Sequence, residues 1–543
     1  MKMIENKREI FITESEGRLL GWRRVGINTT PTSASVVTDA TMNSNKDEGT
    51  VVYESIEQDG NAMQCQDKYI DRILSDELLE LSMTERNTIT EEIHGVRDSF
   101  PEEKELPESL ANSLNDLDAE IDSSLREHND GRKRKFTGLK PEHVPTNREF
   151  RLSMLRCELL DAKRAANRLL TYITLLRYAC SCGRGVSGCN CGSFVAGNCG
   201  RIQMKWFTKE ERAILKKGLV QLMPYRDRSG RRVLVIFSPI FKLIMRTRMK
   251  IIIYLLSEAS EDVESQKRGV VMLLWPGMSD SASSTGTNYI NVFERKLVMY
   301  FQNSLPMRLV AIHFGLLDSP ILKFVRAVVV TLMEGHMRTR LNIITGTWTE
   351  MNYKIMCYGI HAEMIPITEN YVIKTRNHSQ WLQARKCVEL DPFGSVRTTA
   401  DGGLVIECPG LNDVLFNRGK SCQFHPGNVI FRGALESTKR KHWLANQTVK
   451  KQLAWQLMEE VEKKNGRFLH WSKPGWWVKF RDRGEIRHKI ATSLRDFNKV
   501  QVVDSSTSTF RNQQGAKKRK REKVDDWDVS PDCSCLKNIS TKP

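Results

Sequence analysis

The feature that most constrains the fold is an alternation of apolar, strand-like runs with helix-like segments between residues 233 and 358. The strand-like runs are Val233–Phe237, Gly269–Leu274, Leu309–Phe314 and Leu341–Ile344. The helix-like segments are Phe241–Glu258, Val292–Asn303, Ile321–Met333 and Thr349–Tyr358. A continuous apolar run is typical of a strand that is buried on both faces. Strands that alternate with helices in this way predict an α/β layer with a largely parallel sheet.

Charge is distributed unevenly along the chain. The 543 residues carry a net charge of +18 and are long enough for about three or four domains. The segment Lys46–Asp130 contains 7 basic and 24 acidic residues, whereas Glu407–Lys499 contains 19 basic and 9 acidic residues. A basic region attracts phosphate, either in nucleic acid or on an anionic membrane surface. An ordinary solvated Lys/Arg surface explains any single cluster equally well.

Signals for secretion and for membrane insertion are both missing from the sequence. The first residues, MKMIENKREIF, lack the apolar core of a secretory signal. The most apolar segment, Ile321–Met333, is short and is interrupted by Lys323 and Arg326, so no transmembrane segment is expected. The 13 cysteines are scattered apart from one cluster, which fits a reducing compartment. We therefore expect an intracellular protein of the nucleus or the cytoplasm.

Composition also predicts which parts of the chain are ordered. Residues 1–66 are rich in Ser, Thr and Asn and are expected to be disordered. An amphipathic helix is expected within 67–96, and an acidic, mostly polar linker from Pro101 to Asp130. The predicted units are a disordered segment (1–66), an acidic helical and linker segment (67–146), a helical lobe with a Cys-rich insertion (147–217), an α/β domain (218–392), a basic module (408–499) and a disordered basic tail (500–543).

Three stretches in the middle of the chain resemble one known family. They are Leu155–Arg156 with Asp161–Leu170, Gln221–Pro224 with Asp227–Val235, and Pro306–His313 followed by Pro320 and an apolar helix. Their pattern resembles that of the CRAL-TRIO lipid-binding proteins over roughly residues 147–385. The resemblance implies a helical lobe and a mostly parallel sheet with covering helices. It also implies one hydrophobic ligand between the sheet and a movable gate helix, with no catalysed reaction and no other cofactor.

The segment Ile321–Met333 matches the position of the gate helix. Its apolar residues cover so wide an arc that a helix there should be buried on more than one side. The residues placed against a ligand such as a phospholipid are Ile321, Phe324, Val325, Val328, Val329 and Leu332. Candidates for binding a phosphate headgroup are Arg246, Lys250, Arg338 and Arg340. The alternative is a plain core helix, with the four cations in surface salt bridges.

A cysteine cluster lies between the two lobes. Cys180, Cys182, Cys189 and Cys191, followed by Cys199, have the spacing C-x-C-x6-C-x-C-x7-C. Thiolates this dense are candidate zinc ligands, although structural zinc sites usually use C-x2-4-C. The glycine-rich surroundings fit a flexible insertion as an alternative.

The basic module begins with the motif Asn412–Asn428, NDVLFNRGKSCQFHPGN. Together with Gly466–Leu469 and Gly475–Val478, this motif resembles a microalgal module of unknown function whose pattern is written NDVLxGRG. A phosphate-binding P-loop is excluded, because Val414 stands where that motif requires its first glycine.

The residues of the module also predict its secondary structure. Asn428 is predicted to cap a helix at Val429–Trp443, and a second helix is predicted to start at Asn446. Residues 467–469 and 476–478 are predicted to form a hairpin, and Ile486–Phe497 a third helix. The module is therefore expected to be a small α+β domain in the order helix, helix, hairpin, helix.

Several basic residues of the module are candidates for contacting an anion such as a phosphate backbone. They are Arg418, Lys420, Lys450, Lys451 and Arg487. Trp471, Trp476 and Trp477 could stack on bases, although a hairpin with adjacent tryptophans more often buries one in its core. Charge alone does not specify a partner, so DNA and a protein remain equal alternatives.

The tail contains a block that resembles a nuclear localisation signal. It consists of Lys517, Lys518, Arg519, Lys520 and Arg521. The alternative is a solvated run of charge in a disordered tail.

Two functions follow from these observations. The first is a non-enzymatic intracellular lipid-binding or lipid-transfer protein, with peripheral membrane contact and a basic module that binds nucleic acid or protein. The alternative is a nuclear DNA-binding or regulatory protein whose CRAL-TRIO-like fold carries no exchangeable lipid. Stoichiometric lipid in the purified protein would separate the two.

Overall fold

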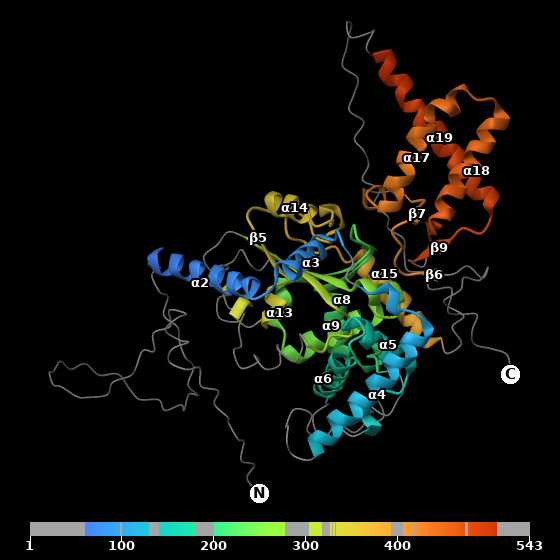
Figure 1. The fold of residues 1–543 in the computed structure, drawn as a ribbon. Coiled ribbons are helices and arrows are strands. Elements are labelled where there is room, and N and C mark those ends of the chain that lie inside the picture. The colour runs from blue at the N-terminus through green and yellow to red at the C-terminus, as the bar shows by residue number, and fades with distance from the viewer. Residues whose placement is uncertain are drawn as a thin grey trace, which may run out of the picture.

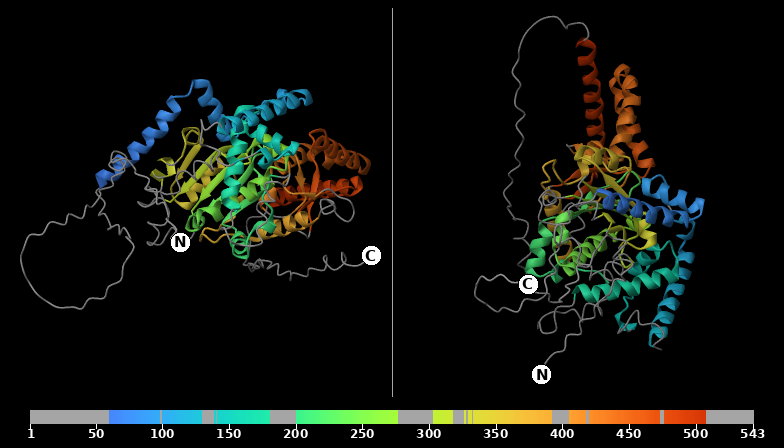
Figure 2. Two further views of the ribbon diagram at one scale, coloured as in Figure 1. Left: turned by 90° about the horizontal axis from the view of Figure 1, so that it is seen from below. Right: turned by 90° about the vertical axis from the view of Figure 1, so that its left-hand side faces the viewer.

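The computed structural model describes residues 60–97, 100–129, 139, 141–180, 200–276, 303–317, 326–327, 329–331, 333–391, 405–417, 420–472 and 476–507. They form an α/β unit surrounded by helices and a C-terminal module that projects at the upper right of Figure 1. Figure 2 shows from two further sides that the module extends away from the α/β unit. Within these residues, every helix is too short or too polar to span a bilayer.

The main sheet has five strands, which lie side by side in the order of the chain. They are β1 (Val220–Arg226), β2 (Arg232–Phe237), β3 (Val270–Trp275), β4 (Leu309–Leu316) and β5 (Leu341–Thr345). Strands β2 to β5 are parallel, as predicted, and β1 pairs antiparallel with β2. The apolar runs did not reveal β1, because Pro224 interrupts it and the register shifts between Leu222 and Arg226.

Helices cover both faces of this sheet. Leu234, Met272 and Ile312 lie on the face that packs against α6 (Ala162–Cys180) and α9 (Met245–Ala259). Val235, Leu273 and Ile344 lie on the opposite face, which packs against α14 (Trp348–Met356). The predicted α/β layer is therefore present.

The strand order does not reverse between β2 and β5. The connection from β2 to β3 through α9 and α10 (Val263–Arg268) and the described part of the connection from β4 to β5 lie on the same face. Doubly wound sheets bind nucleotides at the point where their strand order reverses. The described strands offer no such point.

The acidic segment that the sequence predicted as a linker is a helix, which corrects that prediction. Helix α4 (Pro107–Asn129) buries Leu117, Ile121 and Leu125 beside α6. These three residues recur at helical spacing, and each buried side chain stabilises the fold by up to about 2 kcal/mol. The acidic residues between them concealed the pattern.

Two helices precede α4 where the sequence predicted one. Helix α2 (Gly60–Leu79) and helix α3 (Met83–His94) are separated because Ser82 starts a new helix. The Ser82 hydroxyl accepts from the Glu85 backbone N–H, and the Glu85 carboxylate accepts from the Ser82 backbone N–H. This capping box satisfies donors that a helix start leaves open.

The helical lobe consists of α5 (Arg148–Cys157) and α6, and Asn147 caps α5. The predicted continuous pattern is broken at Leu159 and Leu160, whose φ angles are 54° and 68°. L-residues rarely adopt such angles, so the chain turns here instead of continuing the helix.

The remaining helices of this part are short or peripheral. They are α8 (Lys209–Lys216), α13 (Gly335–Arg338) and α15 (Arg376–Leu390), with 3-10 turns η1 (Glu102–Lys104), η2 (Pro141–His143), η3 (Met204–Trp206), η4 (Ser238–Lys242) and η7 (Ala362–Met364). The predicted helix Val292–Asn303 lies outside the described residues, apart from Asn303.

The C-terminal module has the predicted order of helix, helix, hairpin and helix. These elements are α17 (Pro426–Leu444), α18 (Gln447–Lys463), β8 (Phe468–Trp471), β9 (Trp477–Lys479) and α19 (Arg483–Thr507). Two short strands, β6 (Val405–Ile406) and β7 (Val414–Leu415), flank the hairpin in the order β6-β9-β8-β7, and α16 (Lys420–Gln423) precedes α17. Helix α19 continues past the predicted end of the module at residue 499.

A buried arginine connects the module to the α/β unit. The Arg226 guanidinium donates to the backbone oxygens of Pro409 and Gly230, at 3.1 and 2.9 Å, and pairs with Asp262 at 2.5 Å. Nearby, the rings of His361 and Phe424 stack with their centroids 4.0 Å apart. Since Pro409 belongs to the start of the module, these contacts fix where it begins.

Candidate functional site

Three apolar side chains form a row across strands β3, β4 and β5, from the middle of the main sheet to its edge. Leu274 on β3 is opposite Phe314 on β4, and Phe314 is opposite Ile343 on β5. Cross-strand partners share one face of a sheet, so the three side chains lie next to one another. We call them the apolar row.

The apolar row is less covered than the rest of the same face. Phe314 is buried, but Leu274 and Ile343 are only half-buried. On the same face, Leu234 and Ile312 are fully buried beneath helices. Apolar residues of an α/β sheet are ordinarily buried, so among the described residues this row is less completely covered than its neighbours on the same face.

The gate-like segment lies over the apolar row. Val329 packs on the cluster that contains Phe314, Leu316 and Ile343. The neighbouring Val330 is buried in a cluster with Ile70 of α2, against which Ile343 also packs. The described residues of the segment therefore contact both the sheet and α2. The other predicted ligand-facing residues, Ile321, Phe324, Val325, Val328 and Leu332, lie outside the described residues.

Ion pairs connect α2 to the gate-like segment and to helix α13, which follows it. Arg326 pairs with Asp71, and Arg338 pairs with Glu77. Arg338 also donates to the Val330 backbone oxygen at 3.0 Å. The pairs are partly exposed to solvent, so each contributes little by itself. Together they attach α2 to the outer side of the segment.

Of the four predicted headgroup residues, Arg338 is thus paired with α2, and the other three also have internal partners. Lys250 is buried, and its amine lies 2.6 Å from Glu211 and 2.8 Å from the Trp206 backbone oxygen. Arg246 donates to the Ala179 backbone oxygen at 3.1 Å. A lipid phosphate would have to replace these partners, and the structure does not gather the four cations at one pocket mouth.

Arg340, the fourth candidate, belongs to a buried charge cluster. Glu92 of α3 accepts from Arg340 at 2.6 Å and also from Arg308. Burial raises the pKa of Glu92, but the two guanidinium groups outweigh it and hold that pKa below its usual value. The cluster fastens α3 to the starts of β4 and β5.

His313 lies on the opposite face of β4 and serves a structural role. Its ring approaches Tyr358 with 4.5 Å between centroids, and its Nδ1 lies 3.1 Å from the Asn342 amide. Burial lowers the pKa of His313 to about 3, so the ring is neutral at physiological pH.

In the C-terminal module, the first residues of the NDVL motif bind their own domain. The buried Asp413 carboxylate accepts from the backbone N–H groups of Gly410 and Arg467, at 2.7 and 2.9 Å, and pairs with the Arg467 side chain at 2.7 Å. Asn412 donates to the Lys464 backbone oxygen at 2.7 Å. The polar half of the motif is therefore used to connect β7 with the end of α18.

The HPGN half of the motif is also structural. Asn428 does not cap the helix as predicted, because α17 begins at Pro426 and His425 is the cap residue. Instead the Asn428 amide accepts from the Leu415 N–H at 2.7 Å and donates to the Leu415 oxygen at 2.9 Å. It pairs with β7 as a neighbouring strand would.

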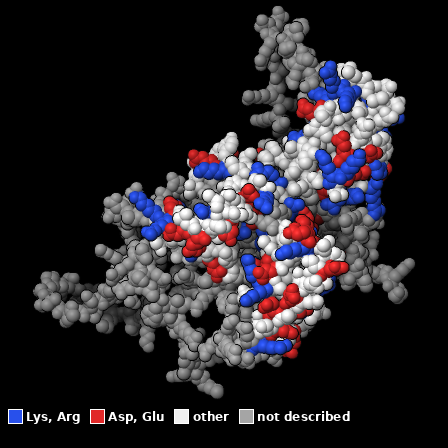
Figure 3. Space-filling view, viewed as in Figure 1, with Lys and Arg blue, Asp and Glu red and all other residues white. Residues whose placement is uncertain are grey.

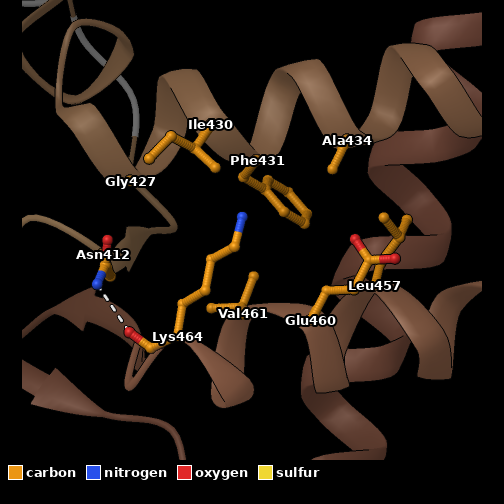
Figure 4. Close-up of a pocket in the computed structure, with 9 residues that line it drawn as sticks. All are labelled: Asn412, Gly427, Ile430, Phe431, Ala434, Leu457, Glu460, Val461 and Lys464. Carbon is orange, nitrogen blue, oxygen red and sulfur yellow. Dashed lines mark hydrogen bonds between the residues drawn. The ribbon is translucent and has the colours of Figure 1, made fainter.

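A shallow cleft separates α17 from α18 beside the motif. Figure 4 shows the Lys464 side chain extending from the end of α18 toward Ile430 and Phe431 of α17, while Asn412 bonds to the Lys464 backbone. The cleft has room for about one or two water molecules. It is too small to hold an organic ligand.

The predicted anion-binding residues are distributed over the module. In Figure 3, Lys and Arg atoms gather on the module at the upper right, with fewer Asp and Glu atoms between them. Lys450 and Lys451 lie together near the start of α18, whereas Arg487 lies near the start of α19. Arg418 and the side chain of Lys420 lie outside the described residues. Of the three tryptophans, Trp477 is buried in the core.

Two further predicted sites fall mostly where the structure gives no description. Cys182, Cys189 and Cys191 lie outside the described residues, and of Cys180 only the backbone, at the end of α6, is described. The basic block from Lys517 to Arg521 also lies outside. Among the residues that are described, no group of His, Cys, Asp or Glu is arranged to hold a metal ion.

Sequence reasoning missed two features. The apolar runs predicted Leu274 and Ile343 as strand residues, but not that the described residues leave both side chains half-buried. The sequence pattern predicted that Trp443 lies in a helix, but not that its side chain is exposed at the end of that helix.

Comparison with known proteins bears on the C-terminal module only. A family described as a domain of unknown function (DUF6824) matches residues 413–496. The match falls within the predicted module of residues 408–499. No curated protein matches the chain. The module is therefore similar to a domain whose function is not known.

Proposed function

We propose that this protein is a non-enzymatic binding protein whose α/β unit holds one hydrophobic ligand, such as a phospholipid chain, against the apolar row. The observation that carries the proposal is that Leu274 of β3 and Ile343 of the edge strand β5 are half-buried on one face of the sheet. A hydrophobic ligand there would remove this apolar area from water, at roughly 25 cal/mol per Å².

The position of the gate-like segment supports the same proposal. Val329 contacts the cluster around Phe314, so in this proposal the segment forms one wall of the site and the sheet the other. The ion pairs of Arg326 with Asp71 and of Arg338 with Glu77 hold α2 over the outer side of that wall. Entry of a ligand would require the segment to move outward against α2. Higher salt is therefore expected to speed exchange of the ligand, because partly exposed ion pairs are screened.

Solvent extraction of the full chain after purification from cells tests the proposal. Mass spectrometry of the extract is expected to find about one lipid per chain. The variant Ile343→Trp fills space beside the apolar row and is expected to lower the lipid content at least tenfold. Val372→Trp is the matched control, because Val372 is exposed beside residues that pack on the opposite face.

The proposal is wrong if the wild-type chain yields no stoichiometric lipid although its amide hydrogens exchange as slowly as those of a folded protein. It is also wrong if Ile343→Trp retains as much lipid as Val372→Trp. In either case the half-buried residues would be an unfilled part of the core.

A further inference from the structure

The far end of the C-terminal module exposes apolar side chains at one corner. Helix α17 ends at Leu444, and α18 begins at Gln447. Trp443 is 61% exposed, Leu444 75% and Val449 39%. Single exposed apolar residues are common on soluble proteins, but three within seven residues at a corner form a patch. We call Trp443, Leu444 and Val449 the apolar corner.

Basic side chains surround the apolar corner. They are Lys439, Arg440 and Lys441 in the last turns of α17, Lys450 and Lys451 near the start of α18, and Arg495 on α19. The acidic residues nearest to them in sequence on these helices are Glu436 and Asp496. The surroundings of the corner are therefore strongly positive.

Helices α17, α18 and α19 pack against one another, and His442 of α17 lies within reach of charges on the other two. Its pKa is lowered by burial and also by the charges of Lys450 and Arg495. The two cations therefore lie near the same ring, although they belong to α18 and α19. Cations near the start of a helix are disfavoured by its dipole, and the first turn of α18 has no acidic residue to offset Lys450 and Lys451. An external anion would offset this unfavourable concentration of positive charge.

We infer that the apolar corner docks on an anionic lipid bilayer. Trp443, Leu444 and Val449 enter the interface, and the surrounding lysines and arginines contact lipid phosphates. Tryptophan favours the level of the headgroups, and the basic ring supplies the attraction to an anionic leaflet. Nucleic acid fits less well, because the aliphatic Leu444 and Val449 cannot stack on bases as an aromatic ring does. This inference does not depend on a ligand at the apolar row.

Sedimentation of the full chain with vesicles tests the inference. The chain is expected to bind vesicles of phosphatidylcholine with about one third phosphatidylserine, and to bind pure phosphatidylcholine at least tenfold more weakly. Trp443→Ser with Leu444→Ser is expected to lower binding to the anionic vesicles at least tenfold. Lys450→Gln with Lys451→Gln should lower it by a similar factor and reduce its dependence on salt.

A matched control is available on the same helix. Val429 and Ile430 are 49% and 47% exposed near the opposite end of α17. Val429→Ser with Ile430→Ser changes apolar exposure in the same way but is expected to leave vesicle binding within twofold. Quenching of tryptophan fluorescence by lipids brominated on their chains should fall in Trp443→Phe, because Trp443 is the residue that enters the bilayer.

Three results would overturn the inference. The first is a wild-type chain that does not sediment with anionic vesicles. The second is equal loss of binding in the control pair and in the apolar-corner pair. The third is salt-dependent binding to duplex DNA that Lys450→Gln with Lys451→Gln abolishes, in a chain that does not bind vesicles. That last outcome would assign the basic surface to nucleic acid, and solvent extraction would still decide the ligand of the α/β unit separately.

Discussion

The two ends of the C-terminal module use polar and apolar residues in opposite ways. Near the α/β unit, polar residues of the motif are buried or half-buried and bonded to one another or to the backbone, as Asp413 and Asn428 are. At the far end, Trp443 and Leu444 are exposed among cations. The residues that are most recognisable in the sequence therefore maintain the fold, and the surface best suited to a partner lies elsewhere.

This comparison separates two kinds of sequence signal. A run such as NDVL or HPGN is specific because several backbone contacts require those residue types together. A binding surface made of lysines, arginines and a few apolar residues has no required order. Substitutions at the motif end should therefore change stability, whereas substitutions at the far end should change binding without changing stability.

The largest effect is expected from Gly427→Ala. A Cβ atom at Gly427 would lie 2.1 Å from the Asp413 backbone oxygen, and the backbone cannot yield as a flexible side chain does. We expect a loss of roughly 3 kcal/mol or more in the unfolding free energy of the module. Urea-dependent hydrogen exchange of α18 in the full chain measures it.

Gly433 provides the control for that prediction. It also lies in α17, but a Cβ atom there would meet nothing within 4 Å. Gly433→Ala should stabilise the module by about 0.5–1 kcal/mol, because glycine is unfavourable inside a helix. Equal destabilisation by the two variants would show that α17 does not pack on the motif as described.

A second large effect is expected from pH. His425 is fully buried, and burial lowers its pKa from 6.5 to about 4, outweighing the nearby Asp413, which raises that pKa. The unfolded chain therefore binds the proton at a higher pH than the folded chain does. The neutral, buried His425 therefore contributes about 3 kcal/mol to the unfolding free energy. This contribution is complete above pH 6.5 and is lost as the pH falls toward 4.

Comparing the wild-type chain with His425→Phe isolates this contribution. The urea dependence of exchange in α18 would be measured at several pH values between 7 and 4.5. The variant should have a smaller loss of stability over this range, whatever its stability at pH 7. Parallel curves for the two proteins would contradict the assignment of a buried, neutral His425.

A smaller effect is expected from Asn428→Ala. The variant loses both hydrogen bonds to Leu415, which should cost about 1–2 kcal/mol. Exchange of the Leu415 amide should rise more than that of amides in α18. Gln456→Ala, at an exposed position of α18, serves as the control and should stay within about 0.5 kcal/mol of the wild type.

The smallest effect is expected at the apolar corner. Trp443→Ala and Leu444→Ala should each leave the unfolding free energy within about 0.5 kcal/mol, because both side chains are mostly exposed. Leu457→Ala, at a buried position, should cost about 2–5 kcal/mol in the same assay. A loss at Trp443 as large as that at Leu457 would mean that the corner belongs to the core.

The sequence predicted those features that depend on neighbours along the chain. Strands β2 to β5 followed from short apolar runs, and α17, α18 and the hairpin followed from periodicity and turn residues. Helix α4 was missed, because Leu117, Ile121 and Leu125 are dispersed among acidic residues and reveal their face only against α6. A local pattern cannot show which partner will cover a sparse apolar face.

Features that depend on distant contacts could not be predicted. Asp413 binds Arg467, which is 54 positions away in the sequence, and Asn428 binds Leu415, which is 13 positions away. The motif was recognised, but its bonding pattern requires the fold. The same holds for the apolar row, since the exposure of Leu274 and Ile343 depends on packing against parts of the chain that are distant in the sequence.

The attachment of the module through Arg226 has a consequence for the integrity of the chain. Arg226 holds the Pro409 backbone, and Trp381 and Arg385 of α15 approach Glu407. Each of these contacts joins a residue that precedes the connection between Asp391 and Val405 to a residue that follows it. A protease that cuts this connection should therefore release no free fragment, and the two pieces are expected to elute together as a noncovalent heterodimer under native conditions.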